Sequence, residues 1–214
     1  MKPLGILGGT FDPIHYGHLR PAQEVLHALD LGEIRFIPAA NPPHRHPPVA
    51  TVEQRLRMVE LAVADISGFT VDERELKRGG FSYTVPTLES LRREWGARPL
   101  CLLMGVDAFE DIETWHQWQR LTALAHFIVM TRPGWSFPGS DALPSWAQGR
   151  LERDPGKLMQ TPGGKIFFQA VTPQDISATR VRAAIASGEP VEQMLPPAVH
   201  AYIRTNRIYA RRGN

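Results

Sequence analysis

Short apolar runs alternate along the whole chain with stretches in which apolar residues recur every three or four positions. The apolar runs predict buried strands at residues 4–7, 34–37, 69–73, 100–104, 127–130 and 166–168. The helical spacing predicts helices at about 18–31, 51–65, 82–95, 108–118, 177–187 and 198–205. The remaining long stretches predict a charged connector at 74–80 and an irregular excursion at 135–164 with one short helix near 146–153. This alternation is typical of an α/β fold with a doubly wound, mostly parallel sheet.

One helix has a recognisable start and a clear apolar face. Thr51 and Gln54 have the spacing of a capping box at the beginning of the helix 51–65. The face predicted to be buried consists of Leu56, Val59, Ala62 and Val63. Arg55 and Arg57 are predicted to lie on or near the polar side of this helix.

The first strand runs into a glycine-rich loop that ends at a helix. Gly8 and Gly9 interrupt the apolar run, and Asp12-Pro13 favours a turn because the residue before proline avoids helical angles. Glycines allow a phosphate or a ribose to approach the backbone, and Thr10 adds a hydroxyl donor. The unpaired N–H groups and the positive dipole at the start of the helix favour anions.

His15 and His18 stand three residues apart at this helix start, with Gly17 between them. Both rings can therefore face one pocket, where imidazoles suit a phosphate that gains charge during transfer. A metal site made by the two histidines is disfavoured, because no third ligand is near in the sequence. The loop is neither a Walker A loop nor a G-x-G-x-x-G fingerprint.

A second helix start with phosphate-binding chemistry lies near the other end of the chain. Ser177 and Thr179 fall in the first turn of the helix 177–187, and Arg182 follows one turn later. Alone, hydroxyls at a helix start are ordinary capping residues. Together with the N-terminal loop they predict two anion-binding helix starts in one sheet.

Five prolines break the segment 38–48, which also carries His44, Arg45 and His46. An ordinary loop is one interpretation. The other is a phosphate clamp, since loops that follow the strands of such a sheet build its binding site.

Three further positions leave two interpretations open. Asp107, behind Gly105 after the most apolar strand, suits a ribose hydroxyl or a metal-bound phosphate, but it could also cap the next helix. Trp115 and Trp118 are either core residues or a platform for a flat ring. Spacing alone favours Ser82 or Thr84 as a helix cap.

Composition sets the remaining limits. The 214 residues are 43% hydrophobic and 21% charged, which predicts one globular domain over residues 1–214. No apolar run reaches the roughly 20 residues of a membrane span, and no signal peptide is recognised, so a cytoplasmic protein is expected. The net charge of +2 does not indicate a nucleic-acid binder, and the C-terminal arginines are expected to be solvated. The single Cys101 is predicted to be buried and unreactive.

The string G-G-T-F-D-P-I-H-Y-G-H at residues 8–18 resembles the signature of the nucleotidyltransferase superfamily that uses an H-x-G-H motif. The segment Ile176–Thr179 also matches the superfamily. Further matches narrow the resemblance to the branch that adenylylates nicotinate mononucleotide, and they are Asn41–Arg45, Ser82–Thr84, Gly105–Asp107, Trp115 and Arg132–Gly134. The resemblance implies a Rossmann-like nucleotidyltransferase fold. It also implies transfer of the adenylyl group from ATP to nicotinate mononucleotide, which yields deamido-NAD and pyrophosphate.

The same resemblance implies roles for individual residues. The positions implied in ATP binding are Gly8, Gly9, Thr10, Phe11, His15, His18, Gly105, Asp107, Ile176, Ser177, Thr179 and Arg182. Those implied in catalysis are His18, His15, Thr10 and Arg182. Those implied in binding the mononucleotide are Asn41, His44, Arg45, Thr84, Trp115 and Arg132, with Trp115 stacked on the pyridine ring.

The implied reaction needs no general base, because the attacking phosphate oxygen is already anionic. Mg²⁺ is expected on the polyphosphate, held mainly by substrate oxygens and water rather than by a protein metal site. The expected partners are the two small substrates, without nucleic acid or membrane, and a homo-oligomer is left open. The alternatives are an enzyme that uses nicotinamide mononucleotide or phosphopantetheine, a non-catalytic nucleotide sensor, and an RNA-binding module that uses the arginine tail.

Overall fold

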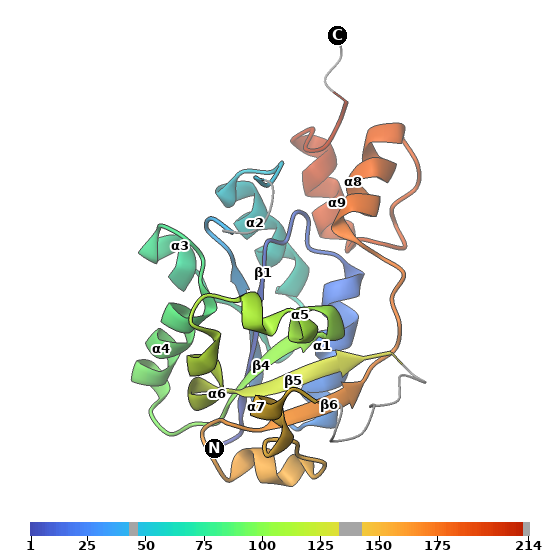
Figure 1. Cartoon of the computed structure of the whole chain (residues 1–214). Helices are drawn as coiled ribbons and strands as arrows, with labels where there is room; N and C mark the ends of the chain where they lie inside the picture. The colour runs from blue at the N-terminus through green and yellow to red at the C-terminus, as the bar shows by residue number, and fades with distance from the viewer. Residues whose placement is uncertain (43–46, 133–142, 212–214) are drawn as a thin grey trace. The chain divides into compact units, whose positions relative to one another are not determined.

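The computed structural model describes residues 1–42, 47–132 and 143–211 (Figure 1). Contacts group the chain into two compact units of interleaved segments. The first unit consists of Met1–Leu7, Pro21–Arg35 and Tyr83–Pro173, and the second of Gly8–Arg20, Phe36–Ser82 and Gln174–Asn214. The expectation of one domain over 1–214 stays a prediction.

The described residues form a six-stranded sheet with the order β3-β2-β1-β4-β5-β6. Its strands are β1 (Leu4–Gly9), β2 (Glu33–Pro38), β3 (Phe69–Val71), β4 (Leu100–Gly105), β5 (His126–Thr131) and β6 (Ile166–Ala170). β4 pairs with β1 and β5, and β5 with β6, all in parallel (Figure 1). This is the strand order of a Rossmann fold, so the predicted doubly wound sheet is confirmed.

The helices follow the predicted alternation. They are α1 (Tyr16–Ala28), α2 (Val52–Val63), α3 (Arg74–Arg78), α4 (Thr84–Trp95), α5 (Val106–Glu110), α6 (Leu121–Leu124), α7 (Ser145–Gln148), α8 (Ala178–Ser187) and α9 (Pro197–Thr205). Short 3-10 turns are η1 (Ile112–Thr114), η2 (Trp118–Arg120) and η4 (Pro155–Met159). Within the second unit, α2 packs against α9.

Two predicted helices are shorter in the structure than expected, and each predicted range contains a residue with left-handed backbone. The helix expected to run to residue 31 ends at Ala28, since Asp30 has φ 47° and the N–H of Leu31 closes the end on the carbonyl of Leu26. The helix expected through 108–118 is broken into α5, η1 and η2, with Gln117 at φ 54°.

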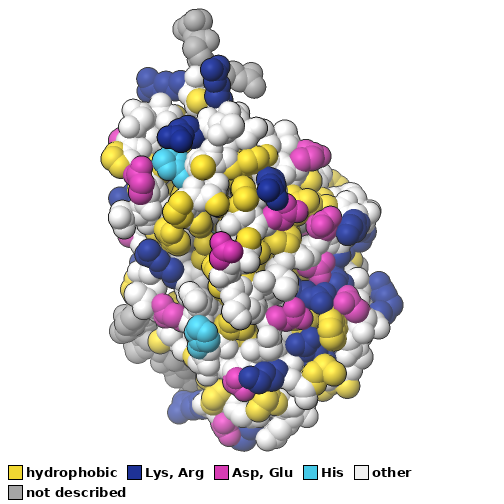
Figure 2. Space-filling view, turned by 180° about the vertical axis from the view of Figure 1, so that it is seen from behind, with side chains coloured by type: hydrophobic (Ala, Val, Ile, Leu, Met, Phe, Trp, Pro, Cys, Tyr) yellow, Lys and Arg dark blue, Asp and Glu magenta, His cyan; other side chains and the backbone are white. Residues whose placement is uncertain are grey.

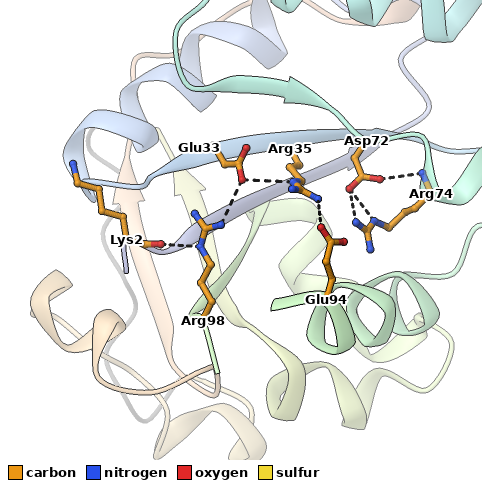
Figure 3. A network of polar contacts seen from close by, with 7 residues as sticks. All are labelled: Lys2, Glu33, Arg35, Asp72, Arg74, Glu94 and Arg98. Carbon is orange, nitrogen blue, oxygen red and sulfur yellow. Dashed lines mark hydrogen bonds and ion pairs between the residues drawn. The ribbon is translucent and has the colours of Figure 1, made fainter. Parts of the chain in front are cut away.

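The charged connector at 74–80 is instead the short helix α3, and Asp72 explains why. Its carboxylate accepts hydrogen bonds from the backbone N–H of Arg74 at 3.0 Å and from the guanidinium of the same residue at 2.7 and 2.9 Å (Figure 3). The bond to the backbone fixes the first turn of the helix, where amide groups otherwise lack partners.

Arginine side chains bind the start of β2 to the end of α4 within the first unit (Figure 3). Arg35 lies 3.2 Å from the carboxylate of Glu94 and 3.6 Å from that of Glu33, and Arg98 also approaches Glu33, at 3.5 Å. The guanidinium groups of Arg35 and Arg98 lie 5.0 and 4.5 Å from the ring of Trp95. Trp95 is half-buried, and the two guanidinium groups lie over its ring.

Cys101 lies in the central strand β4 and is fully buried. The predicted burial is thus confirmed, and this burial raises the pKa of the thiol to about 12, which disfavours a reactive thiolate. Among the described residues no helix is long and apolar enough to cross a membrane. On the face shown in Figure 2, Lys and Arg side chains are interspersed with Asp and Glu.

Candidate active site

The loop from β1 to α1 is shaped by two glycines with different surroundings. A Cβ at Gly9 would lie 2.9 Å from the ring of Phe11, so only glycine fits there without displacing that ring. A Cβ at Gly8 would meet nothing within 4 Å. Gly8 thus leaves open space on an exposed stretch of backbone, where a ligand can approach.

The ring of Phe11 packs against the ring of His18. Its backbone has the left-handed φ of 49°, which is uncommon for a bulky residue and is held here by burial of the ring. The ring of Phe11 meets that of His18 edge-on, with centroids 5.2 Å apart. Phe11 therefore orients the second histidine of the motif.

The two histidines stack with ring centroids 3.8 Å apart, so the two rings of the motif lie side by side. The backbone N–H of His15 donates to Nδ1 of His18 over 3.3 Å. Because Nδ1 accepts, the proton of a neutral His18 resides on Nε2, which makes that nitrogen a donor.

His15 is 4% exposed, and burial lowers its pKa to about 4. It is therefore neutral at physiological pH. Within the described part of the chain, Nδ1 of His15 has no hydrogen-bond partner.

Gly17 brings the C-terminal part of the chain against this loop. A Cβ at Gly17 would lie 2.9 Å from Nδ1 of His15 and 3.0 Å from the carbonyl oxygen of Ile176. The residue directly before the Ser177 motif thus covers the start of α1. Both belong to the second unit, in which the starts of α1 and α8 lie close together.

The start of α8 matches its prediction in detail. Ser177 is the N-cap, and its hydroxyl accepts from the N–H of Arg180 at 3.2 Å. Thr179 is exposed and accepts from Nη2 of Arg182 at 3.3 Å. Nη1 of Arg182 donates to the carbonyl oxygen of Asp12 at 2.7 Å. Arg182 therefore connects α8 to the histidine loop.

Arg55 corrects the sequence prediction for α2. Expected on the polar side, it is 1% exposed and is among the largest fully buried side chains. It donates to the carbonyl oxygens of Thr10 at 2.7 Å and Ala40 at 3.3 Å. Burial lowers its pKa, while the nearby Asp12 opposes that shift. Leu56, expected to be buried, is only half-buried.

Asn41 is held beside the glycine loop by Ser82. The hydroxyl of Ser82 accepts from the backbone N–H groups of Ala40 at 2.8 Å and Asn41 at 3.3 Å. The predicted capping of α4 by Ser82 or Thr84 is wrong, because Tyr83 is the N-cap and makes no capping side-chain bond. His44 and Arg45 lie outside the described residues, as does His46.

In the first unit, three predicted residues lie at one edge of the sheet. Gly105 ends β4 and pairs with Met130 of β5, which ends one residue before Arg132. Asp107 is exposed in the first turn of α5 and makes no capping bond, so the capping alternative is not observed. Carboxyl ends of parallel strands are where such sheets bind ligands.

Trp115 and Thr84 flank a pair of stacked rings in the same unit. The rings of Tyr83 and His116 are 4.2 Å apart and inclined by 28°. Thr84 follows Tyr83 in the sequence, and Trp115 precedes His116. The stacked pair therefore brings the start of α4 close to the turn after η1. Trp118 packs against Trp146 with centroids 5.3 Å apart, which identifies it as structural.

Comparisons with known proteins agree with this geometry. A family model described as cytidylyltransferase-like matches residues 6–184. A Methylococcus capsulatus protein named "Probable nicotinate-nucleotide adenylyltransferase" is 47% identical over 209 residues, which cover 97% of this chain and 100% of that protein. A Halorhodospira halophila protein of the same name is 50% identical over 199 residues, which cover 93% and 91%.

The fold also matches a solved structure titled "Plasmodium falciparum nicotinic acid mononucleotide adenylyltransferase complexed with NaAD". The TM-score is 0.71 at 16% identity, with 98% of both chains covered. The chain therefore belongs to the cytidylyltransferase-like family, within which its relatives are named as nicotinate-nucleotide adenylyltransferases. The resemblance inferred from the sequence motifs is confirmed.

Proposed function

We propose that this protein transfers the adenylyl group of ATP to nicotinate mononucleotide, releasing deamido-NAD and pyrophosphate. The names of its relatives support this activity, as does the NaAD complex of the Plasmodium falciparum structure. The observation that carries the proposal is the hydrogen bond from Arg182 to the carbonyl of Asp12. It joins a group suited to the departing phosphates with the loop that holds His18.

Each end of the triphosphate has suitable donors in the second unit. His18 Nε2, Thr10 and the open backbone at Gly8 suit the α-phosphate, while Ser177, Thr179 and Arg182 suit the β- and γ-phosphates. The full set proposed for ATP is Gly8, Gly9, Thr10, Phe11, His15, His18, Gly105, Asp107, Ile176, Ser177, Thr179 and Arg182. Because the ring of Phe11 is buried, its contribution would come from the backbone.

The reaction is an in-line attack of the mononucleotide 5′-phosphate oxygen on the α-phosphorus of ATP. The nucleophile carries its own negative charge, so no side chain has to remove a proton. Donation from His18 stabilises charge on the α-phosphoryl group, and Arg182 stabilises charge on the leaving pyrophosphate. Neutral His15 acts through its backbone N–H, which sets the tautomer of His18.

The mononucleotide is proposed to bind Asn41, His44, Arg45, Thr84, Trp115 and Arg132. Trp115 is half-buried, which leaves ring surface available to stack on a pyridine. Arg132 is exposed at the end of β5 and can pair with an anionic group of the substrate.

Mg²⁺ would neutralise charge on the triphosphate. The described residues contain no group of three His, Cys, Asp or Glu side chains arranged for a metal, so the oxygens of ATP and water would supply most ligands. Asp107, an exposed carboxylate, could contact a ribose hydroxyl or a hydrated ion on the phosphates.

A pyrophosphate-release assay tests the proposal. ATP is combined in turn with nicotinate mononucleotide, nicotinamide mononucleotide and phosphopantetheine, and the products are identified by mass. Release with the nicotinate substrate, accompanied by deamido-NAD, is expected to be fastest. Faster release with either alternative would assign a different acceptor, and ATP binding without any release would support the nucleotide sensor.

A further inference from the structure

The buried carboxylate of Asp12, in the loop before α1, accepts hydrogen bonds from two distant parts of the chain, at residues 49–50 and at Tyr209. It is 5% exposed and accepts hydrogen bonds from the backbone N–H groups of Val49 at 2.8 Å and Ala50 at 3.0 Å. A third donor is the hydroxyl of Tyr209, only 2.6 Å from Oδ1. The short distance is that of a charge-assisted hydrogen bond.

Tyr209 lies beyond α9 in a backbone conformation that its surroundings must maintain. Its φ is 64°, in the left-handed region that bulky residues avoid, and its side chain is buried. Burial, followed by the hydrogen bond to Asp12, raises the pKa of Tyr209 far above its ordinary value. The hydroxyl therefore stays protonated and always donates to Asp12.

Arg182 lies next to the same carboxylate without a hydrogen bond to it. Its Nη1 is 3.8 Å from Oδ2 of Asp12 and donates instead to the backbone carbonyl of Asp12 at 2.7 Å. A guanidinium and a carboxylate this close attract each other strongly when partly shielded from water. Oδ1 of Asp12 already accepts from Tyr209 and Ala50, and the Oδ2 that faces Arg182 accepts from Val49. These donors compensate the charge of the carboxylate, which weakens its attraction for Arg182.

We propose that Tyr209 is a positioning residue for adenylyl transfer. Its hydroxyl donates to the carboxylate of Asp12 and so compensates the charge of that carboxylate, which keeps Arg182 available to bind the leaving pyrophosphate. Without the hydroxyl, Oδ1 loses its strongest neutral donor, and Asp12 draws Arg182 into a closer ion pair. Arg182 then binds pyrophosphate less well. The inference rests on the proposed function for the role of pyrophosphate as the leaving group.

The test is the affinity of the full-length protein for inorganic pyrophosphate in the presence of Mg²⁺, measured by calorimetry. Tyr209→Phe keeps the ring and removes the hydroxyl, and is expected to weaken binding by about tenfold, the size of one hydrogen bond to a charged group. Tyr202→Phe removes a hydroxyl from α9, outside the hydrogen bonds of Asp12, and should bind pyrophosphate like the wild type.

A double-mutant cycle separates positioning from general damage to the fold. Arg182→Ala weakens pyrophosphate binding, and adding Tyr209→Phe to it should cause no further loss, because Tyr209 acts through Arg182. In steady-state assays Tyr209→Phe should lower kcat and leave the KM for nicotinate mononucleotide unchanged. For a less stable variant, the rise in unfolding temperature with added pyrophosphate gives the same comparison.

The inference is overturned if Tyr209→Phe binds pyrophosphate within about twofold of wild type, or if it weakens Arg182→Ala further, since independent sites add. A wild-type protein that binds pyrophosphate but releases none from its substrates would refute the proposed function alone. A wild-type protein that does not bind pyrophosphate would refute both.

Discussion

The backbone N–H of His15 points at Nδ1 of His18 and fixes which nitrogen of that ring can donate. The stacked rings and the edge of Phe11 hold this orientation from two sides. The first histidine of the motif is thus a neutral, buried support for the second, whose Nε2 remains as a donor.

Replacement of His18 by alanine should therefore remove catalysis and leave the fold intact. Loss of one preorganised donor to the transition state typically costs about 10²–10³ in kcat. Steady-state pyrophosphate release checks this, with circular dichroism to verify folding. His27→Ala is the matched control, because His27 is exposed in the last turn of the same helix. A kcat for His18→Ala within a few-fold of wild type would disprove the phosphate role.

Alanine at Gly8 and at Gly9 should have opposite consequences. Gly8→Ala meets no protein atom, so the unfolding temperature should stay unchanged while kcat/KM for ATP falls by about 10²-fold through displacement of the phosphate. Gly9→Ala collides with the ring of Phe11 and should destabilise the fold by about 1–3 kcal/mol. Thermal unfolding and kinetics of both variants distinguish the cases. Full activity of Gly8→Ala would mean that no phosphate passes there.

Arg55→Met should destabilise the protein although it replaces a charge by an apolar chain. The carbonyls of Thr10 and Ala40 would lose their buried donor, at a cost of about 1–3 kcal/mol each. Arg57→Met, two residues along, removes only an exposed pair with Glu60 and should change stability by less than about 1 kcal/mol. Urea unfolding measures both, and equal effects would show that Arg55 does not hold the loop.

Stability should fall in acid partly because of His15. Burial lowers its pKa from 6.5 to about 4, so the unfolded chain takes up a proton in this range while the folded one does not. Each pH unit between those values then costs at most about 1.4 kcal/mol, and the stability is fully present above pH 6.5. His15→Gln should reduce the loss of unfolding free energy between pH 6.5 and about pH 4, as measured by urea unfolding at each pH.

Part of the loss of stability in acid should remain in His15→Gln, because burial also lowers the pKa of His126. The Nδ1 of that residue accepts from the N–H of Lys165, and Nε2 lies 2.8 Å from the carbonyl of Thr161, which fixes a neutral ring. Parallel stability curves for wild type and His15→Gln would contradict the assignment.

Local chemistry is what made parts of the chain predictable. Thr51 and Ser177 cap their helices as their spacing indicates, because a cap depends on only three or four neighbouring residues. The central strand β4 could be predicted from its unbroken apolar run, as could the burial of Cys101 within it.

The missed features depend on partners far along the chain. Arg55 shares a helical face with Met58, Val59 and Ala62, so its periodicity did signal burial, but its charge concealed this. The hydrogen-bond partners of Arg55, Tyr209 and Ser82 are loop atoms that no local pattern connects to these residues. The left-handed Gln117 between η1 and η2 likewise interrupts the predicted helix, and propensity does not specify it.

The most direct test of the central claim is a crystal structure with α,β-methylene ATP, whose bridging carbon prevents adenylyl transfer. We expect one triphosphate with its α-phosphate within hydrogen-bonding distance of His18 Nε2 and its β- or γ-phosphate within hydrogen-bonding distance of Arg182. A triphosphate that contacts only one of these two side chains, or neither, would contradict it.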